Sequence, residues 1–465
     1  MKWDHIIRGG TLVTPQNMFE ADVYIKDGKI AAISEEPLEG EAAEVTDAKG
    51  RYVLPGLMDT HIHSRDPGPT YKEDFSTSTM AAAAGGITTV FEMPNTKRTI
   101  NNVENFHAQV ENLSTKAHVD FGLWAICLGK LNLDKLQSLN EAGVIGFKFF
   151  WGYAINSKTY ELAYNYTPGM PDVIPPLHDG EVYLMFEEVA KTGKIFAIHA
   201  ENNDLIQSLT EKVLAGGRRD YEALLEGRPP LAETVTVSTG IHFARETGAR
   251  LHILHVSAGG SVDVIEQAQR EGLPITAETC PQYLFLCNED YERIGPMMKI
   301  YPPIKYRADQ ERIWKGLQDG VLSIVCSDHA PHTLEEKDGD LWEIPAGMVG
   351  VETMVPLLLN AVSEGRLTLQ QVVALCSENP AKQYGIYPQK GSLAIGTDAD
   401  FTIVDMSKHV VIKRENLHSR SQNSGFDGVE VIGYPVGTIV RGHTVMKDGE
   451  IVSGPIGQVV LSPAK

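Results

Sequence analysis

Between about residues 56 and 388, short apolar runs alternate with amphipathic stretches, and this alternation constrains the fold more than any other feature of the sequence. The intervening stretches, such as LDKLQSLNEAG and VDVIEQAQREG, have helical spacing and end at or near glycine. Eight runs have the character of buried parallel strands: GLMDTHIH, GITTVFEMPN, VDFGLWAI, GFKFFW, IFAIHAEN, LHILHVS, PITAETC and LSIVCSDHAPH. Eight strand–helix units predict an α/β fold with a TIM-type (β/α)8 barrel, and an open doubly wound sheet is the alternative.

The two ends of the chain have a different, strand-rich pattern. ADVYIKDGKIAAIS near the start and VGTIVRGHTVMKDGEIV near the end each place Asp-Gly between alternating apolar residues, which is a strong signal for a β-hairpin. We therefore expect residues 1–55 and 389–465 to form one small β-sandwich domain, with residues 56–388 as the catalytic barrel. The alternative is a pair of unrelated β segments that flank the barrel.

The composition excludes several classes of protein. The 465 residues include 61 acidic and 41 basic side chains, a formal net charge of −20, which argues against binding to nucleic acid or to an anionic membrane. No window approaches the apolar length of a membrane span, and MKWDHIIRGGTLV lacks the apolar core of a secretion signal. The five cysteines are odd in number and have no CxxC spacing, which argues against a disulfide framework and favours a reducing cytoplasm.

Polar side chains stand at the ends of five of the predicted strands. These residues are His61 and His63 in the first run, Lys148 in the fourth, His199 in the fifth, His255 in the sixth and Asp328 in the eighth. Because barrel enzymes carry their chemistry at the carboxyl ends of the strands, we expect these side chains to meet in one site. Four imidazoles and a carboxylate are sufficient to bind a transition metal, and two metals would need a bridging ligand.

Lys148 is the candidate for that bridge. It lies among Phe147, Phe149 and Phe150, and desolvation of the ammonium group lowers the pKa of a buried lysine. A neutral amine can add carbon dioxide to form a carbamate, which offers one oxygen to each of two metals. The alternative is a surface lysine at a strand end.

The motifs DTHIHSRDPG, GFKFF, HAEN, HVS and SDHAPH stand in the order seen in the amidohydrolase superfamily. More narrowly, the chain resembles the cyclic amidohydrolases: hydantoinase, dihydropyrimidinase, allantoinase and dihydroorotase. The resemblance implies two divalent metal ions, zinc foremost, bridged by carbamylated Lys148 and held by His61, His63, His199, His255 and Asp328. It also implies that Asp328 shuttles the proton and that the enzyme is a homo-oligomer, either a dimer or a tetramer.

The resemblance divides over the substrate. Arg65, Asn95 and His332 match residues that bind a ring carboxylate in dihydroorotase, a task for which the guanidinium fork is suited. Against this, Tyr301 stands where the dihydroorotase pattern has Asn, and Tyr153 matches the tyrosine that hydantoinases and dihydropyrimidinases direct at the developing oxyanion. As a further alternative, Arg65 turns to bind Asp66 or Glu73 instead of a ligand.

We therefore expect a hydrolase that opens the ring amide C–N bond of a cyclic ureide or imide, of the hydantoin or allantoin type, with water activated by metal. The alternatives are a dihydroorotase, a hydrolase of exocyclic or linear amides and a catalytically inactive dihydropyrimidinase-like scaffold. Residues 151–176, WGYAINSKTYELAYNYTPGMPDVIPP, have the length and position of a loop that covers substrate.

Overall fold

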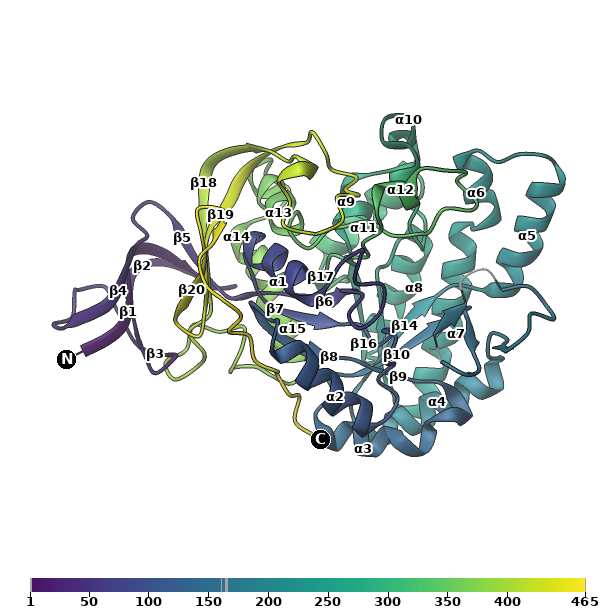
Figure 1. The fold of residues 1–465 in the computed structure, drawn as a ribbon, viewed down its shortest axis with the longest axis horizontal. Coiled ribbons are helices and arrows are strands. Elements are labelled where there is room, and N and C mark those ends of the chain that lie inside the picture. The colour runs from purple at the N-terminus through teal and green to yellow at the C-terminus, as the bar shows by residue number, and fades with distance from the viewer. Residues whose placement is uncertain (1, 160, 164–165, 465) are drawn as a thin grey trace.

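The computed structural model describes residues 2–159, 161–163 and 166–464 and has a barrel with a β domain at one side (Figure 1). The predicted barrel strands all form, and they are parallel: β6 (Leu57–Ile62), β7 (Ile87–Glu92), β8 (Asp120–Leu123) continued by β9 (Ala125–Ile126), β10 (Phe147–Trp151), β14 (Ile195–Ala200), β15 (Arg250–Ile253), β16 (Ile275–Thr279) and β17 (Ile324–Val325). A parallel bridge between Ile62 and His329 joins the first strand to the eighth. The sheet is therefore closed, which confirms the barrel and excludes the open doubly wound alternative.

Helices alternate with these strands and cover the outside of the barrel. They are α1 (Phe75–Ala84), α2 (Val103–Ser114), α3 (Leu136–Ala142), α4 (Asp179–Thr192), α5 (Asn203–Ala215), α6 (Tyr221–Gly227), α7 (Pro230–Thr247), α8 (Gly259–Arg270), α11 (Arg307–Gln318), α13 (Met354–Ser363), α14 (Leu369–Val373) and α15 (Asn379–Gln383), with the short α9 (Pro281–Phe285), α10 (Tyr291–Ile294) and α12 (Leu334–Lys337). Helix α8 shows why they pack here, because its apolar residues Val262, Ile265 and Ala268 lie on one face and are buried.

The strands at the two ends of the chain form one nine-stranded sheet. Its order is β21-β20-β19-β18-β5-β1-β2-β3, with β4 beside β1. The bounds are β1 (Lys2–Val13), β2 (Met18–Lys26), β3 (Lys29–Ser34), β4 (Glu41–Asp47), β5 (Tyr52–Pro55), β18 (Phe401–Val411), β19 (Glu430–Val440), β20 (His443–Lys447) and β21 (Glu450–Ile451). Strand β5 pairs with β18, and Val53, Phe401 and Ile403 share one apolar cluster. The β-sandwich built from both termini is thus confirmed, and the two-segment alternative is wrong.

Both predicted hairpins form at their Asp-Gly turns. Asp27 and Gly28 have φ values of 50° and 71°, and Asp448 and Gly449 have values of 52° and 96°. Positive φ at both central residues is the backbone of the type I′ turn, whose twist matches that of the paired strands.

A buried ionic cluster joins the β domain to the barrel. The ammonium group of Lys390 lies 2.5 Å from a carboxylate oxygen of Asp120 in β8, 2.6 Å from Asp400 and 3.1 Å from Asp398. Arg441 forms a second ion pair with Asp120. Because these charges are buried and paired, they tie the two parts together in one geometry.

The insert after β10 forms a small sheet of its own, in the order β12-β11-β13, from β11 (Ala154–Asn156), β12 (Leu162–Ala163) and β13 (Val173–Ile174). Positions 160, 164 and 165 of the predicted covering loop lie outside the described residues.

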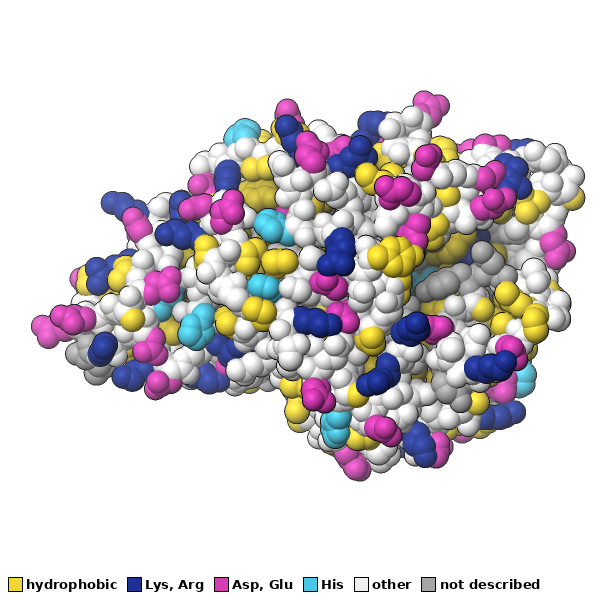
Figure 2. Space-filling model, viewed as in Figure 1, with side chains coloured by type: hydrophobic (Ala, Val, Ile, Leu, Met, Phe, Trp, Pro, Cys, Tyr) yellow, Lys and Arg dark blue, Asp and Glu magenta, His cyan; other side chains and the backbone are white. Residues whose placement is uncertain are grey.

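None of the helices within the described ranges is long and apolar enough to cross a bilayer. All five cysteines are free thiols, and acidic and basic side chains are interspersed over the face in Figure 2.

Candidate active site

A pocket opens at the carboxyl ends of the barrel strands, and we call it the central pocket. Its lining comprises His61, His63, Arg65, Lys148, Phe150, Tyr153, His199, His255, Gln282, Ile300, Tyr301, Asp328, Ala330, Ala346 and Gly347. All six residues predicted as metal ligands are in this set, together with Arg65 and Tyr153. Side chains that are up to 267 positions apart in the sequence thus converge because parallel strands end at the same rim of the barrel.

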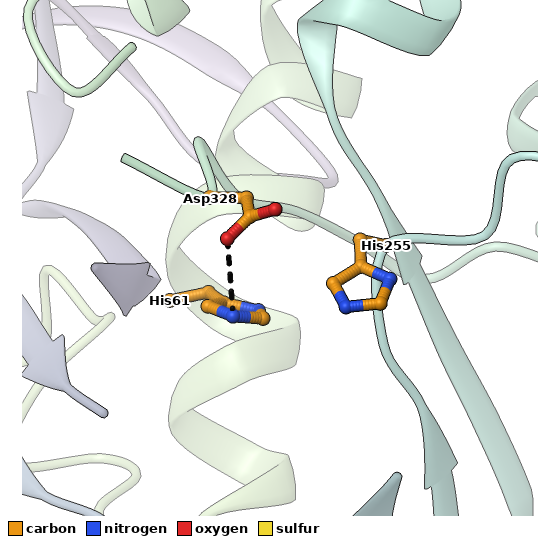
Figure 3. A group of neighbouring side chains, drawn as sticks. All are labelled: His61, His255 and Asp328. Atoms are coloured by element: carbon orange, nitrogen blue, oxygen red, sulfur yellow. Dashed lines mark ion pairs between the residues drawn. The ribbon is translucent and has the colours of Figure 1, made fainter. Parts of the chain in front are cut away.

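Asp328 faces the two histidines of the first strand. Its Oδ1 lies 3.3 Å from Nε2 of His61 and 3.4 Å from Nε2 of His63. Figure 3 shows Asp328 and His61 pointing toward one another, with His255 beside them. Potential ligand atoms of these three lie within 4.8 Å of one another. One carboxylate oxygen between imidazole nitrogens is a donor arrangement that suits a divalent cation.

His199 and His255 form a second group of nitrogen donors. Nδ1 of His199 lies 3.0 Å from Nε2 of His255. Burial lowers the pKa of both imidazoles, and it lowers the pKa of His63 to about 4. These rings are therefore neutral at physiological pH, which is the form that binds a metal.

Lys148 lies on β10 and is completely buried, so the alternative of a surface lysine is wrong. Its Nζ has no hydrogen-bond partner within the described part of the chain and lies 4.4 Å from the centroid of the Phe150 ring. Burial lowers the pKa of the Lys148 amine to about 7. A large fraction of such an amine is uncharged at neutral pH, as the addition of carbon dioxide requires.

Three residues of the central pocket have an unusual backbone. Seven non-glycine residues of the described chain have positive φ, and three of them line the pocket: Arg65 at 63°, His255 at 37° and Asp328 at 49°. L-residues adopt this conformation rarely because of steric contact with the backbone. Strain of this kind persists where surrounding structure enforces it, and it clusters at functional sites.

Known proteins that resemble this chain over its full length identify its family. The sequence model of the Amidohydrolase family matches residues 52–445. The chain is 36% identical over 464 residues to an L-hydantoinase of Paenarthrobacter aurescens, with 98% of both chains covered. It is 35% identical over 463 residues to an allantoinase of Deinococcus radiodurans, with 99% of both covered. This chain belongs to the amidohydrolase family. The solved structure of an L-hydantoinase (dihydropyrimidinase) from Arthrobacter aurescens matches it with a TM-score of 0.92 at 35% identity, covering 99% of this chain and 100% of the other.

Its similarity over the full length to an L-hydantoinase and an allantoinase shows that this member of the amidohydrolase family is a cyclic amide hydrolase. The predicted family and enzyme class are therefore confirmed. The grouped histidine and aspartate side chains are consistent with the binuclear metal site of amidohydrolases.

Two carboxylates of this amidohydrolase that were not predicted from the sequence contact the ring nitrogens of candidate metal ligands. Glu278 on β16 lies with Oε1 2.8 Å from Nδ1 of His61 and with Oε2 3.2 Å from Nε2 of His252. Oε2 of Glu201 lies 2.9 Å from Nε2 of His199. A carboxylate on the far nitrogen fixes the tautomer and orientation of a metal-binding histidine. An acidic residue within a buried apolar strand was the available signal for Glu278.

Tyr153 is placed by a close approach of two backbone segments. The preceding Gly152 has a φ of 97°, and a Cβ atom there would lie 2.3 Å from the carbonyl oxygen of Glu201, so only glycine fits. The Tyr153 ring then packs against His199, with ring centroids 4.9 Å apart. This puts a phenol on the pocket wall beside a candidate metal ligand.

Two predicted substrate contacts have partners within the protein. Oδ1 of Asn95 lies 2.9 Å from Nδ1 of His63, and Asn95 is not among the described residues that line the central pocket. Nδ1 of His332 lies 3.0 Å from Nζ of Lys72, and its Nε2 lies 3.1 Å from the carbonyl oxygen of Ala346. A role of either residue in substrate binding stays a prediction.

Arg65 lines the central pocket and also a neighbouring space, which we call the side chamber, with Lys299, Tyr301, His332, Glu343, Ile344, Pro345 and Ala346. Its Nε donates to the carbonyl oxygen of Pro331 at 3.3 Å. Within the described part of the chain, the hydrogen-bond contacts of Arg65 are to Pro331 and His332 instead of the alternative partners Asp66 and Glu73, which contact Lys116 and Ser419.

Proposed function

We propose that this cyclic amidohydrolase opens the ring amide C–N bond of a cyclic ureide of the hydantoin or allantoin type. The observation that carries the proposal is the buried amine of Lys148, without a hydrogen-bond partner in the described chain, in a pocket lined by two groups of metal-ligand side chains. The donor set fits two divalent cations, with zinc as the first candidate. His61, His63 and Asp328 would hold one cation, His199 and His255 would hold the other, and the carbamate of Lys148 would bridge them.

The residues around the pocket fit the chemistry of amide hydrolysis. Bound in such a site, a pair of divalent cations lowers the pKa of water towards 7 and polarises a carbonyl group. Asp328 takes the proton of the attacking water and returns it to the leaving ring nitrogen. Although burial raises the pKa of Asp328, His61 and His63 hold it below its usual range, so the side chain is a carboxylate at neutral pH.

Tyr153 supplies a hydrogen bond to the oxyanion that develops as water adds to the ring carbonyl. The phenol lines the pocket, and its ring contacts the rings of His199 and Phe150. Loss of a donor of this kind costs about 2.7–4 kcal/mol in a well-studied enzyme.

Three observations support a hydantoin or allantoin ring over dihydroorotate as the proposed substrate. All three residues matched to carboxylate binding contact other protein groups, and of the three, Arg65 alone is among the described residues that line the central pocket. Tyr301 occupies the wall where the dihydroorotase pattern has a smaller amide. The names of the similar L-hydantoinase and allantoinase support the same ring class.

The direct test is to assay the purified protein with allantoin, hydantoin, 5-substituted hydantoins, dihydrouracil and dihydroorotate. We expect ring opening of the hydantoin or allantoin class, loss of activity with a chelator and recovery with zinc or manganese. Fastest turnover of dihydroorotate would establish the dihydroorotase alternative. A chain that binds no divalent metal and gains no activity from it would be the inactive scaffold. The predicted dimer or tetramer is checked by light scattering.

Replacement of Arg65 with Met tests the substrate assignment at one residue. We expect hydantoin turnover to stay within about tenfold of the parent. A neutral ring offers no carboxylate to the guanidinium group, and a charge interaction near the surface is worth only ~1 kcal/mol. Steady-state kcat/KM is the measurement, with Arg65→Lys as the charge-preserving control. Abolished turnover in Arg65→Met, with dihydroorotate as the best substrate of the parent, would contradict the assignment.

A further inference from the structure

A largely buried arginine outside the central pocket contacts Tyr301, which lines the pocket, and Glu201, which contacts the lining residue His199. Arg228 follows α6, and its side chain is only 12% exposed. Its Nη1 donates to Oε2 of Glu201 at 2.6 Å, while its guanidinium carbon lies 3.7 Å from the centroid of the Tyr301 ring. One planar cation therefore touches a carboxylate with its edge and an aromatic ring with its face, the two interactions for which arginine is suited.

The first contact leads to a candidate metal ligand. The same Oε2 of Glu201 that accepts from Arg228 lies 2.9 Å from Nε2 of His199, and the other ring nitrogen of His199 faces His255. Glu201 is buried, so its charge depends on a cation to offset the loss of hydration. Arg228 supplies that cation, and it thereby keeps a charged acceptor on the far side of the imidazole.

The second contact leads to the surface that meets substrate. Tyr301 lines the central pocket, the side chamber and a third space, the outer chamber. The outer chamber is lined in part by Tyr153, Ile206, Leu224, Arg228 and Trp342. The Tyr301 ring stands where these three spaces meet, and the stack on Arg228 holds it there.

We propose that Arg228 is a positioning residue with two separable effects: through Glu201 it orients His199 for metal binding, and by stacking it holds Tyr301 for substrate binding. The inference rests on the proposed function, because it takes His199 as a metal ligand and the central pocket as the ring site. In this inference, the Arg228 side chain affects both the affinity of the site for metal and the KM for substrate.

The two effects can be separated by substitution. Arg228→Lys keeps a positive charge near Glu201 but has no planar face for Tyr301. Glu201→Gln keeps an oxygen acceptor for His199 but removes the negative charge, and it leaves the stack in place. Arg228→Met removes both interactions while keeping much of the side-chain volume. Arg218→Met is the matched control, because Arg218 lies in the preceding segment, is 46% exposed and, within the described part of the chain, forms its ion pairs with Asp220 and Glu226.

Two readouts are needed: the affinity for Zn²⁺ by competition with a chelator, and KM for a 5-substituted hydantoin at saturating Zn²⁺. We expect Glu201→Gln to weaken Zn²⁺ binding by about 10–100-fold and to leave KM within about threefold of the parent. Arg228→Lys should show the opposite pattern, a rise in KM of about tenfold with Zn²⁺ affinity nearly kept. Arg228→Met should show both effects, and Arg218→Met neither.

Parent-like Zn²⁺ affinity in Glu201→Gln, or parent-like KM in Arg228→Lys, would overturn the inference. If Arg228→Met does not fold, Glu201→Gln still removes the negative charge that Arg228 and His199 share, and Arg228→Lys still removes the planar face that stacks on Tyr301. Failure of the inference is distinct from failure of the proposed function. A parent protein that binds no Zn²⁺ or opens no cyclic ureide contradicts the function, whereas an active parent whose variants show no such split contradicts the role of Arg228 alone.

Discussion

Replacement of Asp328 with Asn should lower kcat for a hydantoin by about 10²–10⁴, the range typical of a lost general acid–base group. The Asn amide keeps the shape of the side chain and one oxygen that can bind metal. It cannot accept the proton of water. Asn is also the right choice for the backbone, because Asp328 has a φ of 49° and Asn tolerates the left-handed region. Steady-state kinetics together with metal analysis of the same preparation make the measurement.

The control for this variant is Asp319→Asn, which makes the same chemical change at a partly exposed residue paired with Lys315 on the barrel surface. It should behave as the parent does. An Asp328→Asn enzyme that retains its metal and stays within tenfold of the parent would show that another group moves the proton.

Replacement of Lys148 with Ala should remove the bridge and with it most of the bound metal and activity. The side chain is buried and lines the central pocket together with both groups of candidate ligands. A short-chain carboxylate added to the buffer should restore part of both properties, since it offers two oxygens in the space left by the side chain. Metal content by elemental analysis and turnover with and without the carboxylate are the measurements.

Lys148→Met is the control for the cavity that Ala creates, because it fills the volume without an amine. It should lose metal as Ala does but should not respond to the carboxylate. Full metal loading and normal turnover in the Ala variant would contradict the carbamate.

The sequence predicted the barrel strands well because a strand buried on both faces needs an uninterrupted apolar run, and each such run is local. It predicted the meeting of His61, His255 and Asp328 because parallel strands all end at one rim. It did not predict Glu278 or Arg228, since their roles depend on which distant side chain each one meets. Glu278 lies 217 positions from His61, and no local pattern specifies that hydrogen bond.

The contact of Asn95 is a second case in which the local sequence did not specify the partner of a side chain. Asn95 follows the second strand, as expected for a group at the rim, but its amide oxygen lies beside His63, and no local pattern specifies that contact. Likewise, the burial of Lys148 depends on the rings that surround it in space, and the sequence left the exposed alternative open.

The pairing of β5 with β18 makes the barrel an insertion between two neighbouring strands of one sheet (Figure 1). Leu54 pairs with Thr402, a separation of roughly 350 residues, and contacts of such high order form late in folding. As the chain is synthesised, β5 keeps an unpaired edge until β18 follows the whole barrel, and an open edge is a template for association with other chains. Barrel closure brings the two half-sheets together, so the two parts acquire their stability as one cooperative unit.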